Sequence, residues 1–394
     1  MQQLPRRLQS IDVFRAITMF FMIFVNDVDG VTNIPEWIKH VDRYTDGLGF
    51  ADTIFPAFLF IVGLSIPFAL NKRMQSNESR SSIALHIITR SLALLVMGFF
   101  HVNTENYSHA AILPEPVFEI LMTFAFFLIW LDYKPTLSKR TQNIFQAAGI
   151  LILIVLAILY KGEKHGQEIW LRPQWWGILG LIGWGYLTCA LVYVFTKGKL
   201  SSLIIALILF LAYNIISQTF LLDPVSGILK YCWFIGNGSE ISLIMAGIII
   251  STIYRQKIAS TKAGFLGLIF FLGGLMIAFG FITRPFGGIS KIDATPSWVG
   301  ICIGISIIIF GILIFLVDVK NKAAWFNIIK PAGTSTLTCY LIPYFLYSFL
   351  ELSNVYYPKF LTEGVGGIIR SFAIAFIVIF ITGFLEKKKL RLKI

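Results

Sequence analysis

The first apolar segment of the chain carries three polar side chains on one helical face. Asp12 and Arg15 are three residues apart, so they can form an ion pair along a helix. Asn26 follows Arg15 by eleven residues, close to three whole turns, and therefore lies on the same face about 16 Å further along. Ionisable groups inside an apolar helix are costly, so this stripe indicates a functional site. The alternative is a central helix whose polar groups are satisfied by its neighbours.

A histidine and an aspartate follow this segment. His40 lies in the connection after it and is one of five histidines in the chain. Histidine is well suited to accept a proton near neutral pH, although a histidine in a loop is often only solvated. Asp52 begins the second apolar segment, four residues before Pro56. Because a proline inside a helix removes a backbone hydrogen bond, we expect a kink beside Asp52.

A later polar stretch, between the ninth and tenth apolar segments, brings two cations and an indole close together in sequence. They are Arg284, Lys291 and Trp298. Cations of this kind bind phosphate or carboxylate groups. Gly300 and Gly304 follow at the spacing typical of contacts between membrane helices, and we interpret them as packing positions.

The sequence lacks the motifs of several other chemistries. It contains no Walker loop and no GxGxxG, GxSxG or HExxH pattern. The four cysteines show no CxxC spacing, which predicts buried free thiols rather than a disulfide framework or a zinc site. We therefore expect no metal cofactor.

The composition identifies the environment in which these residues act. Hydrophobic residues make up 56% of the 394 residues, charged residues only 14%, and the mean hydropathy is +0.76. A soluble domain carries about 25% charged residues. The chain therefore has too little polar surface for a soluble or disordered protein. This composition predicts an all-α, polytopic membrane protein embedded in a lipid bilayer.

Twelve segments are apolar enough to be membrane-spanning helices, each of which needs about 20 residues. They are 11–28, 49–70, 83–101, 117–132, 142–160, 176–195, 201–217, 238–254, 264–282, 297–317, 333–350 and 365–385. No linker or change of composition separates them. We therefore expect a bundle of about twelve helices that forms one transmembrane domain over residues 1–394.

The positive charges predict the orientation of this bundle. The chain has 33 Lys and Arg against 21 Asp and Glu, a net charge of +12. Most of these cations fall in alternate loops, and the positive-inside rule places such loops in the cytoplasm. With twelve helices, both termini are then cytoplasmic. The excess charge reflects membrane topology, and we expect no nucleic-acid partner.

The N-terminal region resembles a known family of transmembrane acyltransferases. Residues 7–16, 25–26, His40 and 51–65 are similar, in combination, to the heparan-α-glucosaminide N-acetyltransferase family and its bacterial relatives. The resemblance implies transfer of an acetyl group from cytosolic acetyl-CoA, across the membrane, to an amino sugar on the far side. It also implies that the helix pair at 117–160 is an insertion relative to the animal enzyme.

The resemblance assigns roles to single residues. His40 matches the active-site histidine in the loop after the first conserved helix, and Asn26 matches the asparagine that ends that helix. We expect His40 to take the proton of the acceptor and Asn26 to donate a hydrogen bond to the oxyanion. A covalent acetyl-histidine intermediate is the alternative. Asp27, Asp42 or Asp52 would orient His40.

The donor and the acceptor follow from the same resemblance. Coenzyme A carries negatively charged phosphates, and we assign Arg15 with Asp12, and Lys291 with Trp298, to binding acetyl-CoA. The acceptor is expected to be an amino sugar or a glycan of a bacterial envelope. The protein would then lie in the cytoplasmic membrane, where two copies could associate as a homodimer.

Two other functions fit the same composition. A secondary transporter of a small sugar or anion would also have about twelve spans, kinked helices and intramembrane charges such as Glu119. Its polar site would lie near the midplane of the membrane and would be coupled to an ion gradient. A subunit that has lost enzymatic activity is the third alternative.

Overall fold

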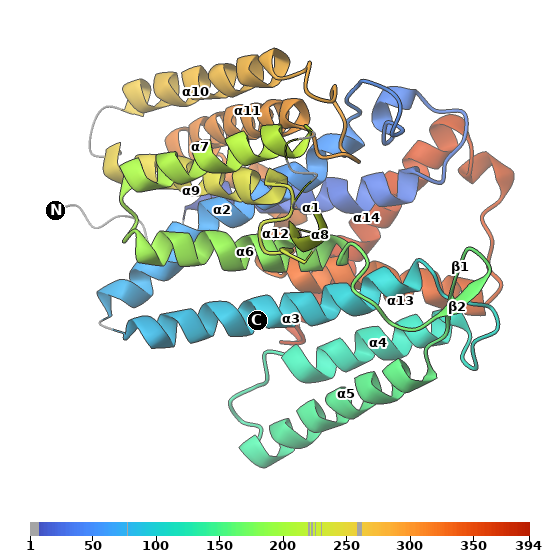
Figure 1. Cartoon of the computed structure of the whole chain (residues 1–394). Helices are drawn as coiled ribbons and strands as arrows, with labels where there is room; N and C mark the ends of the chain where they lie inside the picture. Colours follow the sequence, from blue (N-terminus) through green and yellow to red (C-terminus); the bar gives the residue numbers. More distant parts are fainter. Residues whose placement is uncertain are drawn as a thin grey trace.

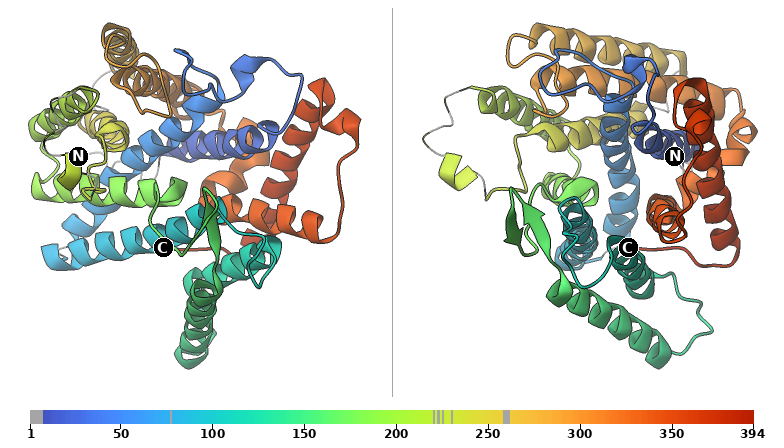
Figure 2. Two further views of the ribbon diagram at one scale, coloured as in Figure 1. Left: turned by 45° about the vertical axis from the view of Figure 1, so that its right-hand side comes forward. Right: turned by 90° about the vertical axis from the view of Figure 1, so that its right-hand side faces the viewer.

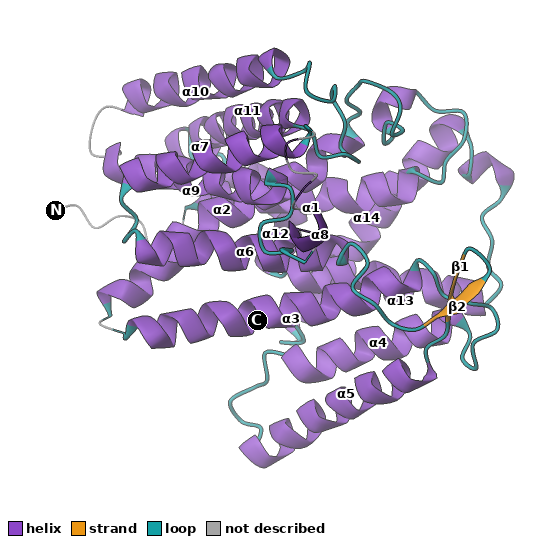
Figure 3. Cartoon of the chain, viewed as in Figure 1, coloured by secondary structure: helices purple, strands orange, loops and turns teal. Residues whose placement is uncertain are grey.

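The computed structural model describes residues 8–76, 78–219, 221, 224, 226–229, 231–257 and 262–394 as a bundle of α-helices (Figures 1 and 3). Each of the twelve segments predicted from apolarity forms a helix. The all-α class is thereby confirmed. Arg7, the first residue of the N-terminal motif, lies outside the described residues.

The helices that correspond to the twelve segments are α1 (Gln9–Val28), α2 (Ala51–Gln75), α3 (Arg80–Thr104), α4 (Glu115–Trp130), α5 (Lys139–Leu159), α6 (Gly177–Phe195), α7 (Leu200–Ser217), α9 (Ser239–Lys257), α10 (Lys262–Ile282), α11 (Pro296–Leu313), α13 (Thr336–Leu352) and α14 (Gly364–Lys387). Their connections include two short helices, α8 (Ser226–Leu229) and α12 (Lys330–Thr334). An antiparallel hairpin of β1 (Gly162–Lys164) and β2 (Gln167–Ile169) follows α5.

Within the described part of the chain, eight helices are long and apolar enough to cross a membrane: α2, α3, α5, α6, α7, α10, α11 and α14. The other predicted segments fall short for visible reasons. Helices α4 and α13 have only 16 and 17 residues, whereas α1 and α9 carry charged and hydroxyl side chains. The number and apolarity of these helices make the chain an integral, multi-pass membrane protein.

Polarity along the helices follows their position in the bundle. Every residue of α9 from Ile241 to Tyr254 is buried, so this helix is shielded from lipid and tolerates serine and threonine. Only 17% of the apolar window is buried in α5 and in α7, which face outward. Helices α4 and α5, the predicted insertion, form a hairpin at the edge of the bundle (Figure 2).

Glycines allow several of these helices to approach closely. Gly63 of α2 lies against the backbone of α9, and Gly247 of α9 lies against the backbone of α2, so a Cβ atom at either position would collide with main-chain atoms. Gly300 and Gly304 make the same kind of contact with α10. This confirms that the two glycines are packing positions.

A buried ion pair connects α1 to α14. The Asp27 carboxylate accepts hydrogen bonds from the Arg370 guanidinium at 3.0 and 3.2 Å, from Ser371 at 2.6 Å and from the Tyr347 hydroxyl at 2.7 Å. The Asp27 and Arg370 side chains are only 4% and 10% exposed. Nearby, the backbone of Thr32 pairs with that of Thr362 and Gly364. The end of α1 that precedes His40 is therefore fixed in position.

Removing one partner of this pair should destabilise the fold. Arg370→Met leaves the buried Asp27 carboxylate without its counter-charge, which we expect to lower the free energy of unfolding by about 3–5 kcal/mol. Lys359→Met is the matched control, because Lys359 is 84% exposed and forms a surface pair with Glu363; it should change stability by less than about 1 kcal/mol. Unfolding in detergent measures both, and equal effects would contradict a structural role for the Asp27–Arg370 pair.

Candidate active site

The loop between α1 and α2 is organised around one buried carboxylate. Asp52 is 1% exposed. One of its oxygens lies 2.7 Å from Nδ1 of His40, and the other accepts the backbone N–H groups of Val41 and Gly49, both at 3.1 Å. A carboxylate with three such partners can remain charged in a buried position. Asp52 therefore fixes both the path of the loop and the orientation of the His40 ring.

The main-chain carbonyl group of Asp52 also forms a hydrogen bond at this site. Pro56 lies inside α2 and has no N–H to donate to the carbonyl group four residues earlier, which is that of Asp52. That carbonyl instead accepts a hydrogen bond from the indole N–H of Trp298 at 3.1 Å. Trp298 is 2% exposed and belongs to α11. Trp298 thus positions the residue that orients His40.

Lys291 reaches the same place from the loop between α10 and α11. Its ammonium nitrogen is 3.0 Å from Nδ1 of His40, 3.4 Å from Nε2 and 3.9 Å from the Asp52 carboxylate. Burial lowers the pKa of Lys291, although the carboxylates of Asp52 and Asp29 oppose this shift. His40, Asp52 and Lys291 form a compact cluster, which we call the His40 cluster.

The two loops that carry the His40 cluster are bound to each other. Asp46 accepts the backbone N–H of Ile289 at 2.7 Å and pairs with Arg284 at 2.9 Å. These two interactions hold the pKa of Asp46 below its usual value. Arg43 pairs with Asp293 at 2.7 Å. Lys291 is therefore held over His40 by a folded pair of loops.

Helix α1 connects the His40 cluster to the interior of the bundle. Its residues Asp12, Arg15, Met19 and Met22 line a cavity of about 570 Å³. Asn26 follows Met22 by one helical turn on the same face and is exposed. The stripe of polar residues expected from the sequence is thus a real face of α1, which leads from the cavity toward the loop that holds His40.

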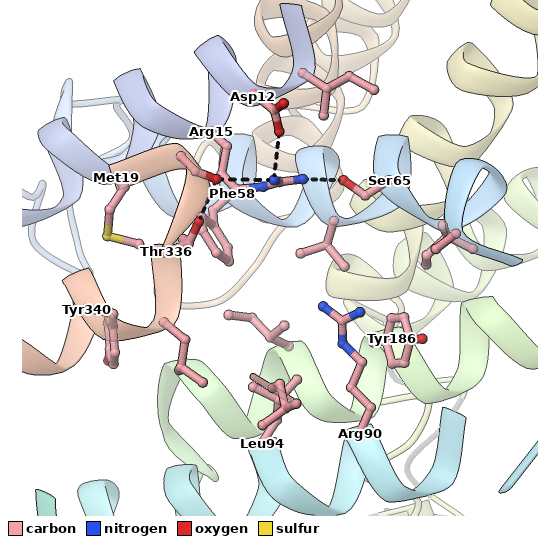
Figure 4. A pocket seen from close by; sticks show the side chains of 18 of the residues that line it. Asp12, Arg15, Met19, Phe58, Ser65, Arg90, Leu94, Tyr186, Thr336 and Tyr340 are labelled. Carbon is pink, nitrogen blue, oxygen red and sulfur yellow. Dashed lines mark hydrogen bonds and ion pairs between the residues drawn. The ribbon is translucent and has the colours of Figure 1, made fainter. Parts of the chain in front are cut away.

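Cations and aromatic rings line the cavity (Figure 4). The Arg15 guanidinium bonds to Asp12 at 3.2 Å, to the hydroxyl of Ser65 at 2.6 Å and to the carbonyl of Gly333 at 3.3 Å. Arg90 approaches from the opposite wall and lies over the ring of Tyr186 at 5.0 Å. Two guanidinium groups thus face one ligand-sized space.

The remaining lining divides into a charged part and an apolar part. Lys72 and Lys393 add two further cations to the wall. The apolar lining includes Met19, Met22, Phe58, Val62, Leu94 and Tyr340. The C-terminal residues reach the wall because Leu392 pairs with Leu131 at the end of α4. Such a cavity suits a long ligand with an anionic end and an apolar end.

The structure groups the residues predicted from sequence into two sites. Asp12 and Arg15 line the cavity. Lys291 and Trp298, predicted to bind the same cofactor, lie instead at the His40 cluster. Among the described residues, no group of three or more His, Cys, Asp or Glu side chains could hold a metal ion.

The sequence of the chain matches a known family. Residues 7–219, slightly more than half of the chain, match a family described as a domain of unknown function, DUF5009. The chain belongs to the DUF5009 family. The matched region includes α1 to α7 and therefore His40, Asp52 and four of the helices that line the cavity, α1, α2, α3 and α6.

Part of this DUF5009 chain is also similar to two curated proteins. It is 38% identical over 105 residues to heparan-alpha-glucosaminide N-acetyltransferase of Homo sapiens, and 35% identical over 102 residues to that of Mus musculus. Each match covers 26% of this chain but only 15% and 14% of the relatives. The family relationship expected from the N-terminal motif is thereby confirmed.

Two residues of the DUF5009 cavity were not singled out from the sequence. Arg90 lies within a predicted span, so its charge inside an apolar segment was a usable signal. Tyr186 gave no signal, because one tyrosine in an apolar helix is ordinary. Only the packing of α3 against α6 brings the two side chains together.

Asp52 offers a test of the loop that does not depend on activity. In Asp52→Ala the N–H groups of Val41 and Gly49 lose their acceptor, so we expect amide hydrogen exchange over 39–50 to accelerate by at least tenfold, about 1.4 kcal/mol of local stability. Asp42→Ala is the control, since the side chain of Asp42 accepts hydrogen bonds from Tyr44 and Thr45 rather than from Val41 or Gly49. Unchanged exchange at Val41 and Gly49 in Asp52→Ala would show that Asp52 does not organise the loop.

Proposed function

We propose that this protein is a transmembrane acyltransferase that moves an acetyl group from acetyl-CoA, bound in the cavity, to an amino sugar or glycan at the His40 cluster. The observation that carries the proposal is the position of the His40–Asp52 pair at the end of the α1 face that lines a cationic cavity. The names of the curated relatives support acetyl transfer to a glucosaminide.

The cavity is suited to the donor. Coenzyme A has phosphate groups at one end and a thioester at the other. Arg15, Lys72, Arg90 and Lys393 supply positive charge to the wall, which also carries the carboxylate of Asp12, while Lys393 pairs with Asp132 at 3.3 Å. Guanidinium groups bind phosphate oxygens in bidentate fashion. The apolar wall formed by Met19, Met22 and Phe58 would hold the pantetheine arm, with the thioester directed along α1 toward Asn26.

The His40 cluster is suited to the chemistry. With its Nδ1–H donated to Asp52, His40 presents the lone pair of Nε2 as a base for the proton of an acceptor amine or hydroxyl. The ring is 31% exposed, so an acceptor can reach it. Asn26 would donate a hydrogen bond to the oxyanion. Attack by His40 itself, through an acetyl-histidine intermediate, uses the same atoms.

The positive-inside rule gives this arrangement a direction. The cavity cations lie toward the end of the bundle where α1 begins, which the rule places in the cytoplasm, where acetyl-CoA is found. The His40 cluster would then face the outside of a bacterial cytoplasmic membrane. An envelope glycan is the acceptor that such a location favours, and the acetyl group alone would cross the membrane.

Replacing the base should separate binding from chemistry. In His40→Ala we expect acetyl-CoA to bind as in the parent, while release of free CoA in the presence of glucosamine falls by about 100- to 10,000-fold. Calorimetry and a thiol assay on the purified protein in detergent measure the two quantities. His165→Ala is the control, because His165 is exposed in the turn between β1 and β2. Failure of the parent to bind acetyl-CoA would favour the transporter.

Replacing the cavity arginines should weaken acetyl-CoA binding, in contrast to the loss of turnover expected for His40→Ala. Arg15→Met and Arg90→Met each remove a charge-assisted contact to phosphate, so we expect acetyl-CoA affinity to fall by about 10- to 100-fold for each. Arg140→Met is the control, because Arg140 is an exposed cation at the start of α5. Equal affinity of all three variants, measured by calorimetry, would place the coenzyme elsewhere.

A further inference from the structure

We propose that Lys291 is a second catalytic residue of this site: its ammonium group stabilises the negative charge that forms on the thioester oxygen. The inference rests on the proposed function. It gives Lys291 a role in the acyl-transfer step itself, in place of a contact to the phosphates of coenzyme A.

The first argument is a conflict at one nitrogen atom. Nδ1 of His40 lies 2.7 Å from the Asp52 carboxylate and 3.0 Å from the Lys291 ammonium. A ring nitrogen carries either a hydrogen or a lone pair, so it cannot donate to the carboxylate and accept from the ammonium together. The shorter contact to a charged acceptor favours donation to Asp52. Lys291 is then close to Nδ1 without being hydrogen-bonded to it.

The second argument is that the acceptors near the Lys291 ammonium, among the described residues, are distant: with Nδ1 of His40 donating to Asp52, the lone pair of Nε2 lies 3.4 Å away. The distance from the ammonium nitrogen to the Asp52 carboxylate is 3.9 Å, which is too long for a hydrogen bond. The Lys291 side chain is only 29% exposed, so water replaces few of the missing contacts. A partly buried ammonium group next to a base is thus preorganised to donate to a negative charge that appears beside it.

The third argument concerns the charge of the cluster. Asp52 is negative, Lys291 is positive and a neutral His40 leaves the three groups balanced. Protonation of His40 alone would place two cations about 3 Å apart, which is unfavourable. A negative oxygen on the substrate removes this repulsion. Lys291 therefore favours proton transfer to His40 only when the oxyanion forms in the same step.

The reaction step balances without any change at Lys291. The acceptor nitrogen bonds to the carbonyl carbon of the thioester, the carbonyl electron pair moves onto oxygen, and Nε2 of His40 takes a proton from the acceptor. The oxygen then reforms its double bond, the carbon–sulfur bond breaks, and the CoA thiolate takes the proton from His40. Lys291 remains an ammonium group and donates to the oxygen while it is negative.

The surroundings of Lys291 are compatible with this role. The charged and titratable groups that face it are Asp52 of α2, Asp29 after the end of α1, His40 of the loop and Cys302 of α11. Burial lowers its pKa, and the two carboxylates partly restore it. The neighbouring cation of the same loop, Arg284, lies 2.9 Å from Asp46 and stabilises the contact between the two loops.

The test compares Lys291→Met and Lys291→Arg with Arg140→Met, as purified full-length proteins, with acetyl-CoA as donor and glucosamine as acceptor probe. We expect kcat of Lys291→Met to fall by about 100-fold, with KM for acetyl-CoA unchanged within about threefold. Lys291→Arg keeps a cationic donor and should restore most of kcat, whereas Arg140→Met, which removes an exposed cation at the start of α5, should leave kcat and KM unchanged.

Several outcomes would overturn the proposal. A Lys291→Met protein that is merely less stable, with normal kcat per folded molecule, would make Lys291 a structural partner of Asp52. A rise in KM with unchanged kcat would return it to binding the coenzyme. A parent protein that binds acetyl-CoA but releases no CoA would refute the proposed transferase, and Lys291 as a catalytic residue with it, whereas an active parent with an active Lys291→Met variant refutes Lys291 alone.

Discussion

The burial of one charged residue, Asp52, is the constraint on which the rest of the site depends. A carboxylate that is 1% exposed must be given partners. It obtains them from the ring of His40 and from the backbone of Val41 and Gly49. Its carbonyl, which Pro56 leaves free, binds Trp298. One residue thus determines the loop conformation, the histidine orientation and the contact between α2 and α11.

Helix α1 relates this cluster to the cavity. Its buried ion pair to Arg370 fixes one side of the helix, while Asp12 and Arg15 on α1 line the cavity. Because α1 is enclosed by other helices, it can carry charges that a lipid-facing helix could not. In the proposed reaction, acetyl-CoA and the acceptor would approach α1 from its two ends. Each proposed residue role then corresponds to one position along this helix.

Much of the fold was predictable, because a helix in lipid must be about 20 residues long and apolar. All twelve predicted segments form helices, and eight of the described helices obey that rule. The stripe of Asp12, Arg15 and Asn26 was predictable from helical periodicity alone. The pairing of His40 with Asp52 was expected as one of three options, since the loop path that selects it depends on backbone contacts. The positions of Lys291 and Trp298 were not predictable, because they depend on how α11 packs against α2.

The break between α12 and α13 has a mechanical consequence. At Ser335 the backbone leaves the helical conformation, with φ −129° and ψ 48°, and residues on both sides of it line the cavity. The glycine crossings of α2 with α9 and of α10 with α11 leave those pairs no room to slide. They act as a stiff frame. The wall formed by α12 and α13 is interrupted at Ser335, and α13 is not held by such a crossing. We therefore expect a ligand larger than the cavity to be admitted by a tilt of α13, while the α2–α9 and α10–α11 pairs stay in place.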